Sequence, residues 1–364
     1  MPLRCLPLVL LLGLLACSGS GGKADKEKNE PKIDPERVRL YSKNLQQYTD
    51  AMLLCGSTQP GDWAEAKKQF DLLHPFVVDK EDPDLIRQFK EGSDSARKEL
   101  ARRGVILRSV LVFCTTVDRA KWEDARKTLM SSGEAGQVLL STTLLGMLLN
   151  GQNLTLFPQI RFTLVDSGPI ALETTIGLAK QLVSTTPADA AIFKMEDLVQ
   201  VIMVIIAFGD QGAASLQELS RDSKANVRRC VARAIGESRD GSAIAMLLRL
   251  LTDSEWTVRM SATQAMGQMA SARSVAGPAL VERLRKEQDG LVFRSTLRAV
   301  GDLMYADAIP QLMAVLELPS RDTLEAAMGA LYIITGEKHL RREQWYEWYR
   351  TRYPDWKLKN AKKP

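Results

Sequence analysis

The chain is poor in the residues from which most active sites are built. Its 364 residues include only two histidines, His74 and His339, and 6% are aromatic. So few histidines argue against a histidine-rich metal site and against a Ser-His-Asp triad. No Gly-rich nucleotide loop, H-E-x-x-H helix, G-x-S-x-G elbow or paired CxxC is present. We therefore expect no catalytic, cofactor-binding or metal-binding residues, and we do not expect an enzyme.

Cysteine is scarce as well. When Cys5 and Cys17 of the N-terminal segment are set aside, Cys55, Cys114 and Cys230 remain. An odd number of cysteines at unrelated spacings is not a disulfide framework. Because each of the three lies in an apolar helical context, we expect buried small hydrophobic residues.

The sequence also lacks a hydrophobic run long enough to cross a membrane. Outside the N-terminal segment, the most apolar stretch is 198–208, which has eleven residues between acidic neighbours at 196–197 and 210. A membrane-spanning helix needs about 20 apolar residues. We therefore expect 198–208 to form a fully buried helix.

The N-terminus has the layout of a secretory signal peptide. One basic residue, Arg4, precedes an apolar run, and small residues follow it. The sequence LLAC, which ends at Cys17, resembles the lipobox of bacterial lipoproteins, in which the cysteine becomes residue one and is diacylated. The resemblance implies that 1–16 are removed and that Cys17 carries the lipid. Cleavage near 18–22, which would release a secreted protein, is the alternative.

Residues 17–36 are predicted to be a lipidated cysteine followed by a flexible tether. From 18 to 36 there are nine charges and almost no apolar residues, so this segment cannot bury a core. Two or three acyl chains on one cysteine hold a protein stably on a membrane. The serine after Cys17 resembles the default signal of the lipoprotein family for the outer membrane. The resemblance implies a protein anchored in the bacterial envelope, on the periplasmic face of the outer membrane.

The strongest internal signal is a repeat within 211–336. The apolar residues of the chain are mainly Leu, Ala, Val, Met and Ile, which favour helices. Four segments can be aligned on alanines spaced 31, 34 and 31 residues apart, a period typical of a solenoid of helical hairpins. In each segment, apolar or small residues at i, i+4, i+7 and i+8 form one helical stripe. The stripes are Val227, Val231, Ala234 and Ile235; Val258, Ala262, Ala265 and Met266; Val292, Thr296, Ala299 and Val300; and Thr323, Ala327, Ala330 and Leu331.

A second apolar helix is predicted before each of these segments. Pro278 and Pro310 stand where its first turn should begin, which is the helical position that tolerates proline. Such a helix pair cannot cover its own apolar face, so it must stack on the next pair.

A charged pattern accompanies the repeat. Asp222 with Arg228, and Asp253 with Arg259, fit the arrangement D-x4-V-R, and the third repeat keeps Asp289 at a shifted spacing. The pattern resembles the HEAT-like repeats of bacteria, the class first named from phycobilisome lyases. The resemblance implies an all-α, right-handed α-solenoid of helical hairpins. It also implies a structural ladder of charge-assisted bonds between adjacent repeats, formed by these two Asp–Arg pairs.

The region 37–210 is predicted to be helical throughout. A tryptophan followed by a helical alanine and a basic residue occurs at Trp63 and again at Trp122. We expect either more divergent hairpins that continue the array or a separate all-helical domain.

The segment 337–364 is basic and aromatic. It carries nine Lys or Arg and four Asp or Glu, a net charge of +5. Its L-x-x-I-T-G stretch and W-x-x-W helix resemble the terminal segment that often follows bacterial HEAT-like repeats, which implies a C-terminal capping helix. One helical face carries large side chains that either cover the last repeat or contact a partner. These are Trp345, Trp348, Tyr349, Arg352 and Trp356.

These features lead to one main hypothesis and two alternatives. The main hypothesis is a membrane-tethered scaffold that binds an envelope protein, with Arg229, Arg233, Gln264 and Arg298 among the polar residues of its concave surface. The first alternative is a binder of envelope glycan or lipid that uses the basic aromatic tail. The second, favoured less, is a lyase or chaperone-like enzyme by analogy with the family that named the repeat. Export argues against a nucleic-acid partner, although the charge of the tail would suit one.

Overall fold

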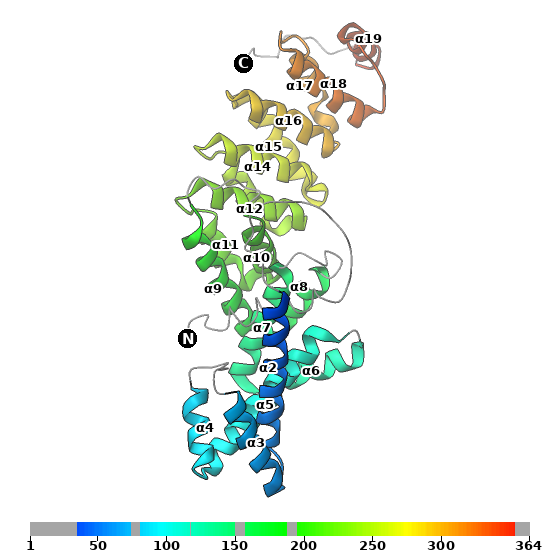
Figure 1. Cartoon of the computed structure of the whole chain (residues 1–364). Helices are drawn as coiled ribbons and strands as arrows, with labels where there is room; N and C mark the ends of the chain where they lie inside the picture. The colour runs from blue at the N-terminus through cyan, green and yellow to red at the C-terminus, as the bar shows by residue number, and fades with distance from the viewer. Residues whose placement is uncertain (1–34, 74–80, 117, 150–156, 188–194, 354–364) are drawn as a thin grey trace. The chain divides into compact units, whose positions relative to one another are not determined.

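The computed structural model describes residues 35–73, 81–116, 118–149, 157–187 and 195–353 (Figure 1). Within these ranges the chain forms α-helices and short 3-10 helices and no strand. The chain divides into two compact units between Gly177 and Leu178, a boundary that lies inside one helix. The all-α fold predicted from composition and periodicity is therefore confirmed for the described residues.

The N-terminal unit is organised around its longest helix. The helices α2, α4 and α6 pack directly on α5. Two side chains fix helix starts, because the hydroxyl of Ser93 accepts from the backbone N–H of Ala96 and the carboxylate of Asp118 accepts from that of Ala120. The helices are α2 (Pro35–Leu54), α3 (Pro60–Leu72), α4 (Asp82–Lys90), α5 (Asp94–Thr115), α6 (Arg119–Ser131), α7 (Gly133–Leu149), α8 (Phe157–Asp166) and the first part of α9 (Pro169–Thr185).

A buried ion pair connects three helices of this unit. The carboxylate of Asp82 is 1% exposed and accepts from Arg103 at 2.9 Å and from the hydroxyl of Tyr48 at 2.8 Å. Arg103 also donates to Glu81 at 2.6 Å and to Glu99 at 3.1 Å. Because a buried charge must be paired and hydrogen-bonded, this network fixes α4 against α2 and α5.

The two predicted tryptophan helices are present. Trp63 lies in α3 and Trp122 in α6, both within the first turns, as predicted. Both rings contact α5, because the guanidinium of Arg97 lies 4.7 Å from the ring of Trp63 and Phe113 stacks on Trp122 at 4.5 Å. The tryptophans therefore connect successive helices to the same central helix.

The C-terminal unit is an α-solenoid. Its inner helices α10, α12, α14, α16 and α18 pack in series, each on the next, and appear as successive layers in Figure 1. A shorter or irregular outer helix precedes each of the last four. The elements are α10 (Glu196–Ala207), α11 (Ala213–Leu219), α12 (Ala225–Ser238), α13 (Ile244–Leu250), α14 (Trp256–Gly267), α15 (Arg273–Lys286), α16 (Gly290–Asp302), α17 (Ile309–Val315), α18 (Arg321–Thr335) and α19 (Arg342–Arg352).

The predicted apolar stripes form the core of the array. All sixteen stripe positions are buried, and the most exposed of them, Thr323, is 6% exposed. The hydroxyl of Thr296, a polar member, donates to the carbonyl of Val292 at 2.8 Å, so this buried hydroxyl is paired. The helical periodicity of the sequence thus identified the buried face correctly.

Close contacts between inner helices depend on glycine. A Cβ placed on Gly236 would lie 2.8 Å from the Cα of Ala265. The same geometry recurs one repeat on, where Gly267 lies against Ala299, and again where Gly301 lies against Ala330. Each glycine stands two residues after an aligned alanine, so small residues face small residues at every junction and the helix axes can approach closely.

The array begins earlier than residue 211. The helix α10 packs on α12, and all of its residues from Leu198 to Ile206 are buried. The expectation of a fully buried helix at 198–208 is confirmed for α10, and no helix among the described residues is long and apolar enough to span a membrane. The C-terminal unit starts at Leu178, upstream of the boundary predicted from the repeat, because α10 lacks the alanine and charged pattern but supplies the same packing surface.

The cysteines match their expectation where they are described. Cys55 and Cys230 are free thiols with 0% exposure, and burial raises the pKa of each to about 12. Cys114 belongs to α5, and its side chain lies outside the described residues.

One predicted helix start is wrong. Pro310 lies in the first turn of α17, as predicted, but Pro278 lies inside α15, which begins at Arg273. The spacing of 34 residues at this junction gives the third repeat three more residues than its neighbours. These residues extend α15 by a turn at its N-terminus, so the proline that aligns with Pro310 becomes internal.

The last inner helix is followed by a short aromatic helix. Gly336, with φ of 75°, ends α18 in the left-handed conformation that glycine adopts without strain. In α19, Trp345 is fully buried and its ring meets the ring of His339 edge-on at 4.7 Å. Burial and the charge of Glu317, two residues after α17, raise the pKa of Tyr346, so α19 lies near the end of α17. This arrangement is that of the predicted capping helix.

The glycine contacts can be tested with a matched pair of substitutions. Gly236→Ala should lower the free energy of unfolding by about 1–3 kcal/mol, because the added methyl overpacks the contact with Ala265. Gly329→Ala in α18 adds the same methyl where nothing lies within 4 Å, so it should raise stability by up to about 1 kcal/mol. Urea unfolding followed by circular dichroism measures both, and equal effects of the two substitutions would contradict the packing argument.

Candidate functional site

Arginine forks join adjacent repeats in the C-terminal unit. Arg228 of α12 donates through Nε and Nη2 to the carboxylate of Asp253 at 2.8 and 2.7 Å. Its third nitrogen, Nη1, donates to the backbone carbonyls of Asp222 and Ser223 at 2.9 and 3.1 Å. One guanidinium therefore ties its own repeat to the next with planar, charge-assisted bonds.

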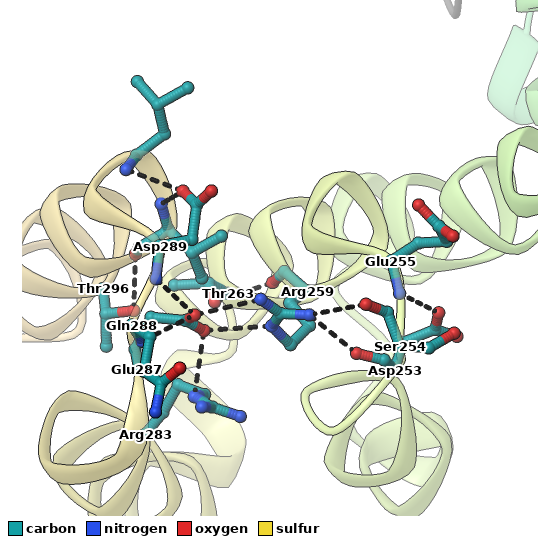
Figure 2. Close-up of polar contacts among 12 residues, drawn as sticks. Asp253, Ser254, Glu255, Arg259, Thr263, Arg283, Glu287, Gln288, Asp289 and Thr296 are labelled. Carbon is teal, nitrogen blue, oxygen red and sulfur yellow. Dashed lines mark hydrogen bonds and ion pairs between the residues drawn. The ribbon is translucent and has the colours of Figure 1, made fainter.

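The same rung recurs one repeat later (Figure 2). Arg259 of α14 donates to both oxygens of Glu287 at 3.0 Å each. It also donates to the carbonyls of Asp253 and Ser254 at 2.9 and 3.0 Å. Arg228, Asp253 and Arg259 are thus brought together as the resemblance implied, whereas the carboxylate of Asp222 accepts from the backbone N–H of Lys224 at 2.7 Å.

The acidic partner in the third repeat is Glu287, which the sequence analysis missed. Glu287 stands five residues before Val292, the spacing that Asp253 has to Val258, so the position is retained with a longer side chain. Asp289 instead begins α16, where its carboxylate accepts from the N–H groups of Leu291 and Val292 at 2.8 and 3.1 Å. The D-x4-V-R pattern, which specifies aspartate, therefore pointed to the helix cap Asp289 and not to the ladder residue Glu287.

A second pair of arginines strengthens the same junctions. Arg249, four residues before Asp253, donates to the carbonyl of Ser220 in the preceding repeat at 2.6 Å. Arg283, four residues before Glu287, donates to the carbonyl of Leu251 at 3.1 Å and lies 3.2 Å from Glu287. The sequence signal for this pair is an arginine one helical turn before each ladder acid.

The ladder acids are held as carboxylates. Burial raises the pKa of Glu287, but the bonds from Arg259 and the backbone N–H of Asp289 outweigh burial, and the charge of Arg283 adds to them. The pKa of Glu287 therefore lies below its usual value, and the pKa of Asp253 is lowered in the same way by Arg228. The side chain of Glu287 is 1% exposed, so its charge depends on these partners.

The inner helices also line an open groove of about 700 Å³. Equivalent positions of the two successive repeats line it on both α16 and α18: Arg294 corresponds to Glu325, and Arg298 corresponds to Gly329. The groove is lined by Met260 and Gln264 of α14; by Leu291, Arg294, Ser295, Arg298 and Asp302 of α16; and by Asp322, Glu325, Ala326, Gly329, Ala330 and Ile333 of α18.

Of the four concave-surface residues predicted from the sequence, two line this groove. Gln264 and Arg298 lie on it, whereas Arg229 and Arg233 of α12 do not. Arg233 is paired with Glu196 at 2.8 Å and with Glu237 at 2.6 Å. Burial lowers the pKa of Arg229, which has no acidic partner among the described residues to offset it.

Two rings of the predicted aromatic face are buried and so are not available to a partner. Trp345 and Tyr349 are 0% and 2% exposed, so these rings cannot contact a partner while α19 is in place. They point inward because an open repeat end exposes apolar surface that aromatic rings can cover. Trp348 is half-buried and Arg352 is exposed, with its guanidinium 3.6 Å from Glu337. Cys17 and Trp356 lie outside the described residues.

The described residues contain no group of three His, Cys, Asp or Glu side chains placed to hold a metal ion.

Comparison with known proteins agrees with the repeat. The family described as HEAT repeats matches residues 213–299. A crystal structure of an engineered protein from the Northeast Structural Genomics Consortium is similar over 90% of this chain and 94% of its own, with 15% sequence identity and a TM-score of 0.34. No curated protein matches the chain.

The lowered pKa of Glu287 predicts a pH dependence of stability. A carboxyl with a depressed pKa in the folded state stabilises it above the unfolded pKa, about 4.3, and this stabilisation is lost as the pH falls through the folded value. Glu287→Gln should therefore lower the free energy of unfolding at pH 7 by about 1–3 kcal/mol and flatten its decline below pH 5.

Urea unfolding between pH 7 and 3 measures this dependence. Glu347→Gln, which neutralises an exposed carboxylate in α19, is the control and should follow the wild type. A Glu287→Gln profile parallel to that of the wild type would show that the rung does not hold the carboxylate charged.

Proposed function

We propose that this protein is a membrane-tethered scaffold of the bacterial cell envelope that binds a partner protein through the groove on α14, α16 and α18. The observation that carries the proposal is the groove itself, which is lined by none of the ladder residues. It combines charged groups, such as Arg294 and Arg298, with exposed apolar ones, such as Leu291 and Ile333, which are 48% and 41% exposed. Exposed apolar side chains beside charged ones are typical of protein interaction sites.

The type of repeat supports the same function. HEAT repeats suggest a protein-interaction scaffold, and a HEAT-repeat solenoid is typically not an enzyme. Stacked helix pairs offer an extended surface without the convergent nucleophile, base and oxyanion site that catalysis needs. One fold hosts many activities, so the groove supports the proposed function more specifically than the repeat does.

The N-terminal sequence supports the location. A lipid on Cys17 would hold the protein at the membrane, and the charged tether 18–36 would let the body move within a thin layer beside it. Restriction to this layer raises the effective concentration of the scaffold toward other envelope components. The burial of Trp345 and Tyr349 removes two of the rings on which binding of glycan or lipid by the tail would depend.

A photocrosslinking residue in the groove tests the binding surface in intact cells. Met260→p-benzoylphenylalanine should give a discrete crosslinked product with one protein, because Met260 lies on the wall of the groove. The same residue at Val275, which is 43% exposed on the outer helix α15, is the matched control and should not give this product. Mass spectrometry identifies the product. Identical products at both positions, or none at Met260, would contradict binding through the groove.

The tether is tested separately. Cys17→Ser in the full chain should move the protein from the membrane fraction to the soluble fraction, because the acylated thiol is lost. Cys5→Ser, within the segment that is removed, is the control and should leave the protein on the membrane. Fractionation and immunoblotting measure both, and full membrane retention of Cys17→Ser would refute the anchor.

A further inference from the structure

Two arginines on the groove make no salt bridge with another described residue, although burial raises the pKa of Asp302 and the charge of Arg298, which is exposed, acts on this carboxyl against the effect of burial. Arg294 and Arg298 are one helical turn apart on α16, and neither forms an ion pair with another described residue. By contrast, the ladder arginines Arg228 and Arg259 are each paired with a carboxylate. Arg294 is half-buried, so part of its hydration is lost without a compensating carboxylate.

A buried hydroxyl beside these arginines is also without a partner. Ser295 is 7% exposed, lies on the groove, and its Oγ makes no hydrogen bond. Helical hydroxyls elsewhere in this chain donate to the carbonyl four residues back, as Thr296 does next to it. Buried polar groups are satisfied in the great majority of cases, so the Ser295 hydroxyl independently marks this spot as incomplete.

The far wall limits the charge that a ligand can carry. Asp302 at the end of α16 and Asp322 at the start of α18 both line the groove, and Glu325 is already paired with Arg321 at 2.9 Å. A polyanion such as a nucleic acid would bring many negative charges against these carboxylates. A ligand with one carboxylate would meet much less of this repulsion on its way to the arginines.

The floor is small and apolar. Ala326 and Ala330 are buried there, and nothing lies within 4 Å of a Cβ placed on Gly329. Together with Ile333 they leave room for the apolar side chains of a ligand that lies along α18. A carboxylate beside short apolar side chains is a combination that a protein segment can present.

We infer that the partner of the proposed scaffold presents a short segment in which a single acidic side chain lies between Arg294 and Arg298 while adjacent apolar side chains cover Ala326, Gly329 and Ala330. The guanidinium groups bind the carboxylate through paired, charge-assisted bonds. This inference rests on the proposed function and adds the chemical class of the partner segment to it.

Selection from a library of random twelve-residue peptides tests the inference on the full-length protein. The wild type should enrich peptides that carry one Asp or Glu within four residues of Leu, Ile, Met or Phe. Arg294→Gln with Arg298→Gln should not enrich them. The control pair, Arg285→Gln with Lys286→Gln, removes the same charge from exposed positions on α15 and should behave as the wild type.

A selected peptide then gives a quantitative cycle. Replacing its acidic residue by the amide should weaken binding to the wild type about tenfold, the scale of one charge-assisted interaction, and should not change binding to the double glutamine variant. Circular dichroism confirms that the variants are folded. The inference is overturned if no acidic peptide is enriched, if polyacidic peptides are preferred, or if the amide has the same effect on both proteins.

The two proposals fail in different ways. In one outcome, a partner crosslinks at Met260 and still binds the Arg294→Gln, Arg298→Gln variant as well as the wild type. That result would support the scaffold proposal and refute the inference about the carboxylate. If p-benzoylphenylalanine at position 260 gives no crosslink in the otherwise unchanged protein, both the scaffold proposal and the carboxylate inference are refuted.

Discussion

The close approach of consecutive inner helices is the constraint on which the rest of the C-terminal unit depends. Gly236, Gly267 and Gly301 each lie against an alanine of the following repeat, at distances where an added methyl would collide. This spacing allows the stripes around those alanines to be buried completely. It also sets the positions of the inner helices α14, α16 and α18, whose side chains line the groove. A repeat array is stabilised by such junctions one after another, because each pair of helices contacts only its neighbours.

The polar ladder has a different task from the apolar core. An arginine paired with a buried carboxylate adds little net stability compared with an apolar pair, but removing one partner is costly. We infer that the two rungs, Arg228 with Asp253 and Arg259 with Glu287, fix the register in which one repeat meets the next. The ladder is absent at the next junction of the described array, where Phe293 stands at the arginine position. There the groove carries the unpaired Arg294 and Arg298 instead.

The helical periodicity of the sequence predicted the features that depend on contacts repeated along each helix. The sixteen stripe residues, the buried α10 and the positions of Trp63 and Trp122 near helix starts follow from helical spacing and local capping. The sequence pattern did not identify Glu287, because it contains aspartate and not the longer glutamate at that position. The position of Pro278 was predicted wrongly because the three additional residues of the third repeat lengthen a helix and not a loop. The aromatic face of α19 was recognised, but which rings point inward depends on the open end of the array, which no local pattern contains. The groove that Arg294 shares with residues of α18 likewise depends on the stacking of repeats.

Hydrogen exchange of the full-length protein, with and without the partner isolated through the Met260 crosslink, tests the central claim most directly. If the groove is the binding surface, exchange should slow in α16 and in the first turns of α18, and it should not change in the outer helices α13, α15 and α17. Slower exchange confined to those outer helices, or to the N-terminal unit, would show that the partner binds elsewhere and would contradict the account.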